Sequence, residues 1–211
     1  TAKDELLLKT PDSLMNGTAT ADVISSCVPA IKQPWFMPSL DVDAILIAIR
    51  IATYGDNMTM TVKVPNTGEE KDFEIDLNGV MENIMSAQYE ELITMDQMKI
   101  TLRPLSYTEF TRDAIRSFEE QRVYNIINDE TVPSEEKMER FRQSFNKLTD
   151  LTISTVAKSI VKIEVDGNTV TEPKHILEFM QNTSKEFYST ILDHISEQRD
   201  KFAVKPFVAT T

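Results

Sequence analysis

The stretch from residue 44 to residue 52 is almost entirely apolar, and it constrains the fold more than any other segment. Its β-branched residues would also suit a strand. Two signals favour a helix instead: Ser39 is placed as an N-cap, and Asp41 and Asp43 lie in the favourable first turn. Gly55 provides a stop signal at the other end. Because a helix that is apolar on nearly all sides needs cover, we expect it to be the central, buried helix of the fold.

Two alternating segments after this helix predict a β-hairpin over residues 57–77. The inward positions are apolar: Met58, Met60, Val62 and Val64 in the first segment, and Phe73, Ile75 and Leu77 in the second. We therefore expect one buried and one solvent-facing surface. A short helix over 79–89 and a third strand over 97–103 follow. We expect this strand to extend the sheet beneath the central helix, because three strands make a stable small sheet.

The next part of the chain predicts a helical hairpin over residues 106–158. Ser106 and Glu109 form a capping-box pattern at its start, and Ser134 is placed as the cap of the second helix. The inward face of the first helix is expected to carry Phe110, Ala114, Phe118 and Ile126. The second helix has a seam with alternating spacings of three and four residues, formed by Met138, Phe141, Phe145, Leu148 and Thr152. Packing within this hairpin is one interpretation of the seam, and an intermolecular coiled coil is the other.

The remaining chain predicts a second β-hairpin over residues 159–171, with a turn at Asp166 and Gly167, and then two more helices. The fold class is thus α+β, mostly helical with a small antiparallel sheet. We divide the chain into an irregular N-terminal segment, a single α+β domain and an extended tail, which cover residues 1–38, 39–202 and 203–211. Within the domain, the central helix and sheet occupy 39–104 and the helical part occupies 105–202.

The charge of the chain bears on its partners. Its formal net charge is −12 and its pI is near 4.7. Such a surface repels phosphate backbones and anionic lipid, so nucleic acid and membrane are disfavoured as partners, and a protein with complementary positive charge is favoured. The single cysteine, Cys27, excludes an intramolecular disulfide and a cysteine-based zinc cluster.

No pattern of catalytic residues is present, and we expect a non-enzymatic protein without a cofactor or metal. His175 and His194 have no glycine-framed serine nearby. Paired acids could instead serve a hydrolase or another modifying enzyme, which is the alternative function. These pairs, which we interpret as solvated charges, are Glu69–Glu70, Glu90–Glu91, Glu119–Glu120 and Glu135–Glu136.

Three aromatic residues are the candidate partner-binding residues. Trp35 and Phe36 lie in residues 33–38, which proline rules predict to be extended, and Phe207 lies in the tail. Large aromatic side chains in irregular segments make good interface anchors. The other interpretation is that the apolar segment 33–38 packs on the core of its own chain.

The central segment, residues 41–55 followed by an alternating strand, resembles the T4-type bacteriophage baseplate protein family. The resemblance continues through residues 64–70 and 172–182. It implies a phage tail protein at the baseplate hub, acting as a structural subunit or as an assembly chaperone. Its partners would be other tail and hub proteins, and a homo-oligomer is a further option. It would be made in the host cytoplasm and, as a structural subunit, would stay in the virion tail.

One departure from this family concerns zinc. Many relatives place a Cys-Pro-x-Cys-Gly knuckle at the tip of the first hairpin, where this chain has Val64 and Thr67 in place of the cysteines. The resemblance therefore implies that a zinc role is lost here, while Pro65 and Gly68 can still form a tight turn. An acidic inhibitor of a basic host protein is the remaining alternative.

Overall fold

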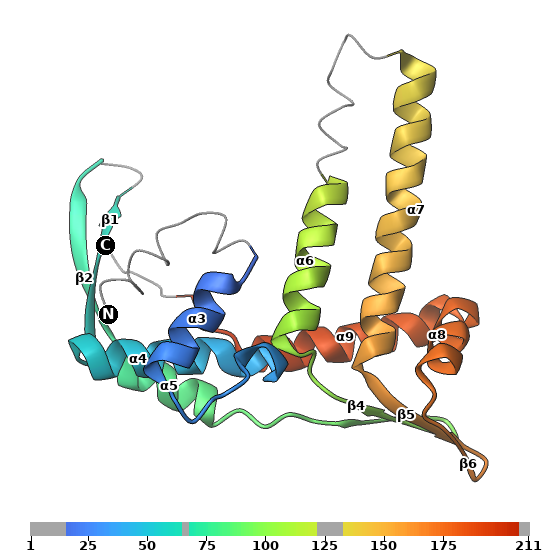
Figure 1. Ribbon diagram of the computed structural model, residues 1–211, viewed down its shortest axis with the longest axis horizontal. Helices are drawn as coiled ribbons and strands as arrows, with labels where there is room; N and C mark the ends of the chain where they lie inside the picture. Colours follow the sequence, from blue (N-terminus) through green and yellow to red (C-terminus); the bar gives the residue numbers. More distant parts are fainter. Residues whose placement is uncertain (1–15, 65–67, 122–132, 207–211) are drawn as a thin grey trace.

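The computed structural model describes residues 16–64, 68–121 and 133–206, and it confirms an α+β fold (Figure 1). The α-helices are α3 (Thr18–Cys27), α4 (Val42–Tyr54), α5 (Leu77–Met85), α6 (Tyr107–Gln121), α7 (Ser134–Ser159), α8 (Pro173–Asn182) and α9 (Lys185–Phe202). The strands are β1 (Asn57–Lys63), β2 (Glu70–Asp76), β3 (Leu92–Met95), β4 (Met98–Leu102), β5 (Ile160–Val165) and β6 (Asn168–Val170). Within the described residues, no helix has both the length and the apolar character that crossing a membrane requires.

The strands form two separate antiparallel sheets, which corrects the expected sheet. The predicted strand over 97–103 exists as β4, but it pairs with β3 and β5 in the order β3-β4-β5-β6. Strands β1 and β2 form a two-stranded sheet of their own. Strand β3, which the sequence analysis missed, joins β4 through a tight turn in which Asp96 has a positive φ. Opposite Ile100, β3 supplies Ile93 and β5 supplies Ile163, so apolar pairing draws β4 to this sheet.

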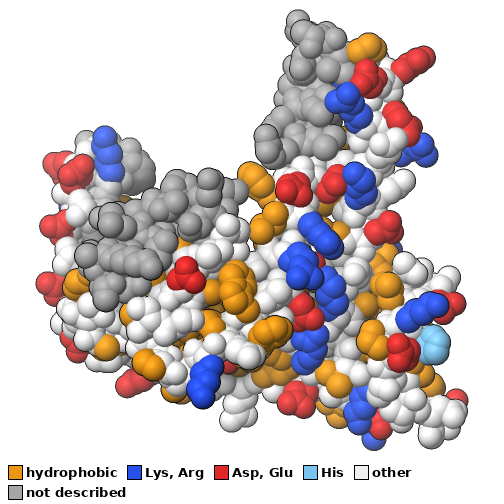
Figure 2. Space-filling model, viewed as in Figure 1, with side chains coloured by type: hydrophobic (Ala, Val, Ile, Leu, Met, Phe, Trp, Pro, Cys, Tyr) orange, Lys and Arg blue, Asp and Glu red, His pale blue; other side chains and the backbone are white. Residues whose placement is uncertain are grey.

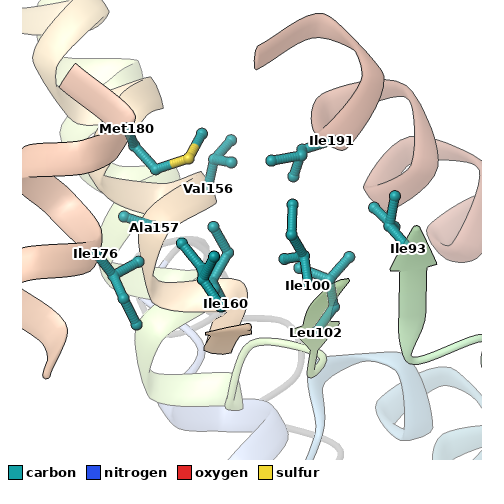
Figure 3. Packing of buried hydrophobic residues seen from close by; sticks show 10 residues of the cluster. Ile93, Ile100, Leu102, Val156, Ala157, Ile160, Ile176, Met180 and Ile191 are labelled. Atoms are coloured by element: carbon teal, nitrogen blue, oxygen red, sulfur yellow. The ribbon is translucent and has the colours of Figure 1, made fainter. Parts of the chain in front are cut away.

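The main core lies between the four-stranded sheet and the helices α7, α8 and α9 (Figure 3). Ile100 of β4 and Ile191 of α9 have no exposed surface at all. Around them gather Ile93, Leu102, Val156, Ala157, Ile160, Ile163, Ile176 and Met180. The second hairpin and the two C-terminal helices are therefore confirmed, and together with β3, β4 and α7 they form the largest cluster of buried apolar residues in the described chain.

Helix α4 is confirmed as a helix that ends at Gly55, whose φ of +88° suits glycine. The predicted N-cap is wrong, because Ser39 begins the 3₁₀ turn η2 (Ser39–Asp41) and Asp41 occupies the N-cap position of α4 without a side-chain hydrogen bond. The expected burial is also wrong. Val42 is buried, whereas the other apolar residues of α4 are half-buried or exposed.

The reason is that α4 packs against two small clusters on different sides and is enclosed by neither. One cluster includes Ile24 and Tyr107. The other, formed by Ile75, Leu77, Val80 and Ile84, joins the β1–β2 hairpin to α5. Helix α5 confirms the short helix predicted over 79–89, although it starts earlier, with Asp76 accepting a 2.9 Å hydrogen bond from the main-chain nitrogen of Asn78.

The N-terminal segment contains a short α-helix, α3, and a 3₁₀ turn. Helix α3 buries Val23 and Ile24, while Cys27 is exposed. The segment 33–38 was expected to be extended, but Pro34–Phe36 form one 3₁₀ turn, η1. Proline suits the first position of a helical turn, and the main-chain N–H of Phe36 donates to the carbonyl of Gln33 at 3.1 Å.

Candidate protein-interaction surfaces

Helices α6 and α7 form the predicted helical hairpin, and Figure 1 shows it projecting from the rest of the molecule. We call this hairpin the arm. Its base belongs to the body, since Val156 and Ala157 near the end of α7 lie in the main core. Farther out, the two helices have each other as neighbours, so the contacts between them decide which side chains remain exposed.

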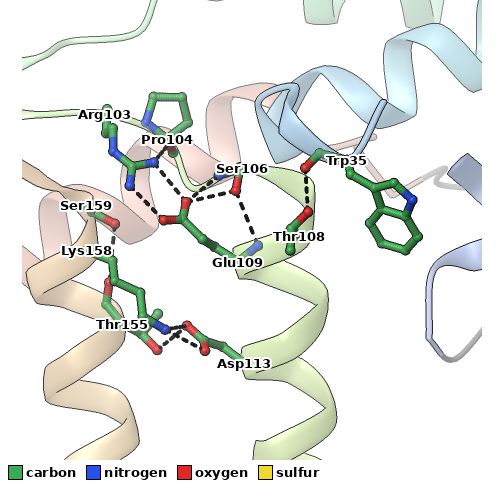
Figure 4. Close-up of polar contacts among 10 residues, drawn as sticks. All are labelled: Trp35, Arg103, Pro104, Ser106, Thr108, Glu109, Asp113, Thr155, Lys158 and Ser159. Atoms are coloured by element: carbon green, nitrogen blue, oxygen red, sulfur yellow. Dashed lines mark hydrogen bonds and ion pairs between the residues drawn. The ribbon is translucent and has the colours of Figure 1, made fainter. Parts of the chain in front are cut away.

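Polar contacts join the two helices of the arm. The Lys158 Nζ donates to both carboxylate oxygens of Asp113, at 2.7 and 2.9 Å, and the Thr155 hydroxyl donates to the same carboxylate at 2.8 Å (Figure 4). Farther along, the Ser144 hydroxyl donates to the main-chain oxygen of Glu120 at 2.9 Å. Asp113 and Ser144 are buried. A buried carboxylate with this many donors holds the helices in one register.

The start of α6 is fixed by a second polar cluster. Arg103 donates to both carboxylate oxygens of Glu109, at 2.9 and 2.8 Å. The predicted capping box is confirmed, since Glu109 accepts from the Ser106 main-chain nitrogen at 2.9 Å and its own nitrogen donates to the Ser106 hydroxyl at 3.3 Å. The hydrogen bonds from Arg103, followed by those from Ser106, lower the pKa of Glu109 from 4.5 to about 2.

This lowered pKa predicts a pH dependence of stability. Because the folded-state pKa of Glu109 lies below its ordinary value, its contribution is present above pH 4.5 and is lost as the pH falls toward 2. We expect Glu109→Gln to lower the free energy of unfolding by about 1 kcal/mol at pH 7, since Glu109 is partly exposed, and by less at pH 3. Urea unfolding at both pH values measures this. Exposed Glu119 on the same helix gives the control Glu119→Gln, and an equal loss at pH 7 and pH 3 would contradict the prediction.

The large apolar residues predicted to face inward on the arm are exposed instead. On α6, Phe110 is 43% and Phe118 is 50% exposed, and on α7, Met138 is 68% and Phe145 is 56% exposed. Ala114 and Thr152 are exposed too, Phe141 and Leu148 are half-buried, and Ile126 lies outside the described residues. The hydrogen bonds and the ion pair that join the helices come from polar residues, and the four large apolar side chains remain exposed.

The exposed residues of both helices face the same side of the arm. At about 100° per residue, Phe110 lies about 60° and Phe118 about 140° from Asp113, which faces α7, and both are displaced in the same sense around the helix. On α7, Ser144 faces α6, and Phe145 lies about a quarter-turn from it. This displacement around the α7 axis has the same sense as that of Phe110 and Phe118 around the α6 axis. The two helices run in opposite directions and face each other. Residues displaced in the same sense from the contact face of each helix therefore lie on the same side of the arm. We call Phe110, Phe118, Met138 and Phe145 the apolar stripe.

The three aromatic residues predicted to bind a partner have different surroundings. Trp35 stacks on Tyr107 with ring centroids 5.5 Å apart, and its carbonyl accepts a 2.8 Å hydrogen bond from the Thr108 hydroxyl. Phe36 is 71% exposed. Phe207 lies outside the described residues. The structure thus gives Trp35 a packing role within the chain, and partner binding by any of the three stays a prediction. The sequence pattern placed Phe110 and Phe118 inside the fold and left open what covers Met138 and Phe145, so it did not identify this surface.

The acidic pairs lie within the described residues, whereas the tip of the first hairpin, residues 64–68, does so only in part. Three of the acids have cationic partners: Glu90 pairs with Lys201, Glu120 with Lys147 and Glu136 with Arg140. Val64 is buried, and Thr67 lies outside the described residues. Among those residues, no group of three or more His, Cys, Asp or Glu side chains is placed to hold a metal ion.

Comparison with known proteins gives one match. A family model described as T4 bacteriophage base plate protein matches residues 1–206. Neither the curated proteins nor the solved structures contain a match to the chain.

Proposed function

The chain belongs to the T4 bacteriophage base plate protein family, and from this premise we propose that it acts at the baseplate hub through contacts with other tail proteins. The family indicates a structural, non-enzymatic role in the phage tail and contacts with other baseplate or tail proteins. The finer proposal of a hub protein without enzymatic activity, cofactor or metal rests on the resemblance and on the arm. The apolar stripe is the observation that carries it.

The apolar stripe has the properties of a protein-binding surface. Its four side chains are each more than two-fifths exposed, and they lie on one side of a projecting helical hairpin whose helices are joined by polar contacts. Exposed apolar side chains that gather in this way mark interaction sites. Aromatic residues and methionine are also enriched where proteins meet. A neighbouring tail protein is the occupant that the family membership favours, and a second copy of this chain is the alternative.

The role takes one of two forms, a structural subunit that stays in the virion or an assembly chaperone that leaves. In either form, we expect the protein to act in the host cytoplasm during assembly, without nucleic acid or membrane as partner. Quantitative mass spectrometry of purified infectious particles and of assembly intermediates tests the proposal. A fixed number of copies of the protein per infectious particle supports the structural-subunit role. Presence of the protein in the assembly intermediates alone supports the chaperone role. Absence from both preparations overturns the proposal.

A further inference from the structure

The β1–β2 hairpin is a sheet with unpaired edges. Within the described residues, β1 and β2 pair with each other and with no third strand. Figure 1 shows β2 as the outermost strand at one end of the molecule. Two strands alone are marginally stable, and an exposed edge presents unpaired N–H and C=O groups that another chain can bind.

The register shows which main-chain groups point outward. The Val64 nitrogen donates to the Glu69 carbonyl, and the Leu77 nitrogen donates to the Asp56 carbonyl. The two residues of each of these pairs lie directly opposite each other on the two strands. Hydrogen-bonded pairs alternate with non-bonded pairs in an antiparallel ladder, so Met60 and Phe73 also form a bonded pair. The main-chain groups that point away from β1 therefore belong to the intervening residues of β2, which are Glu70, Asp72, Glu74 and Asp76.

The two faces of the hairpin differ in chemistry. One face is mainly apolar, with Lys71 opposite Val62, and it leaves Met60 39% and Val62 36% exposed. The other face carries the four carboxylates of β2. Their cross-strand neighbours are Lys63, Thr61, Thr59 and Asn57, of which the lysine alone is cationic. Figure 2 shows acidic side chains gathered at this end of the molecule. A strand that completes this sheet would need basic side chains on one face and apolar side chains on the other.

We infer that the free edge of β2 binds an extended segment of a partner protein in which Lys or Arg alternates with apolar residues. The main-chain groups of Glu70, Asp72 and Glu74 would supply the ladder. The acidic face would select the basic side chains, and the apolar face would cover the others. This inference goes beyond the proposed function and concerns a different surface from the apolar stripe, so each can fail without the other.

A synthetic peptide of alternating lysine and valine tests the inference with the full chain. Fluorescence anisotropy measures its dissociation constant at low and physiological salt, against a control peptide of the same composition with its lysines in one block. We expect the alternating peptide to bind at least about tenfold more tightly than the control. Equal binding of the two peptides would overturn the inference, because charge alone would then explain the affinity.

Variants at Glu74 separate the contribution of its charge to peptide binding from the contribution of the main-chain hydrogen bonds at the strand edge. Glu74→Lys should weaken binding about tenfold at low salt and less at high salt, because the contact is electrostatic. Glu74→Pro removes an outward N–H, which an edge strand tolerates, and should weaken binding at both salt concentrations. The matched control is Glu197→Lys, an exposed position on α9 with the same change in net charge. Circular dichroism confirms folding of each variant.

Three outcomes would overturn the inference. If Glu74→Lys and Glu197→Lys weaken binding equally, the peptide senses net charge and not the hairpin. If the peptide binds only after residues 203–211 are removed, the tail of the chain itself occupies the edge. If sedimentation shows self-association that Glu74→Pro abolishes, the occupant is a second copy of this chain.

Discussion

Phe118→Ser combined with Phe145→Ser is expected to leave the fold stable and to abolish the formation of infectious particles. Both side chains are at least half exposed, so their loss costs little burial within the chain. A bound neighbour would bury them, and buried aromatic anchors contribute about 2 kcal/mol or more each to an interface. Their combined loss would weaken binding by about a thousandfold. Complementation of a phage lacking the protein, scored as infectious particles, measures the effect.

The matched control changes the opposite side of the arm. Arg112→Ser with Asp150→Ser alters one exposed residue on each helix and leaves the net charge unchanged. We expect this control to complement fully. Normal particle yield from the stripe variant, or an equal defect in the control, would refute a binding role for the apolar stripe. A melting temperature within about 2 °C of the parent in both proteins is needed, because unfolding would also lower the yield.

Ile100→Ala is expected to have the largest effect on stability, a loss of about 2–5 kcal/mol in the free energy of unfolding. Ile100 is fully buried on the central strand β4, where it lies opposite Ile93 on β3 and Ile163 on β5. The substitution removes apolar contact and leaves a cavity between sheet and helices. Urea unfolding followed by circular dichroism measures the loss as a lower midpoint at an unchanged slope.

Val161→Ala provides the comparison for the core prediction. Val161 lies on strand β5 of the same sheet, but it is 43% exposed. We expect its truncation to cost about 1 kcal/mol or less, since the smaller side chain leaves no cavity. Similar losses for Val161→Ala and Ile100→Ala would contradict the prediction, because burial in the main core would then not explain the cost of truncating Ile100.

Local patterns predicted most elements because caps, turns and periodicity depend on neighbouring residues. Gly55 ends α4, Asp166 and Gly167 turn the second hairpin, and Ser106 with Glu109 caps α6, all as expected. The predictions at Ser39 and over residues 33–38 failed locally, whereas the wrong sheet depends on distant contacts. Alternation shows that β4 has an apolar face, but the choice of its partners depends on Ile93 and on the second hairpin.

The apolar stripe could not be predicted from the sequence, because it also depends on distant contacts. A seam such as that of α7 identifies an apolar side of a helix, but not the molecule that covers it. The helices of the arm meet through Asp113 and Ser144, residue types that also occur on solvated surfaces. Only the structure reveals that these polar residues are buried while Phe145 is exposed. The alternative of an intermolecular contact along this seam therefore gains support, and the sequence alone left it open.

The length of α7 has a consequence for the dimensions of an assembly. Its 26 residues, at 1.5 Å each, span about 39 Å. Met138 near its outer end is about 27 Å along the helix from Val156 in the main core. A protein bound at the outer end of α7 would thus lie at a fixed distance from a second protein bound to the body. A single protein that contacted both Met138 and the body near Val156 would have to span about this distance.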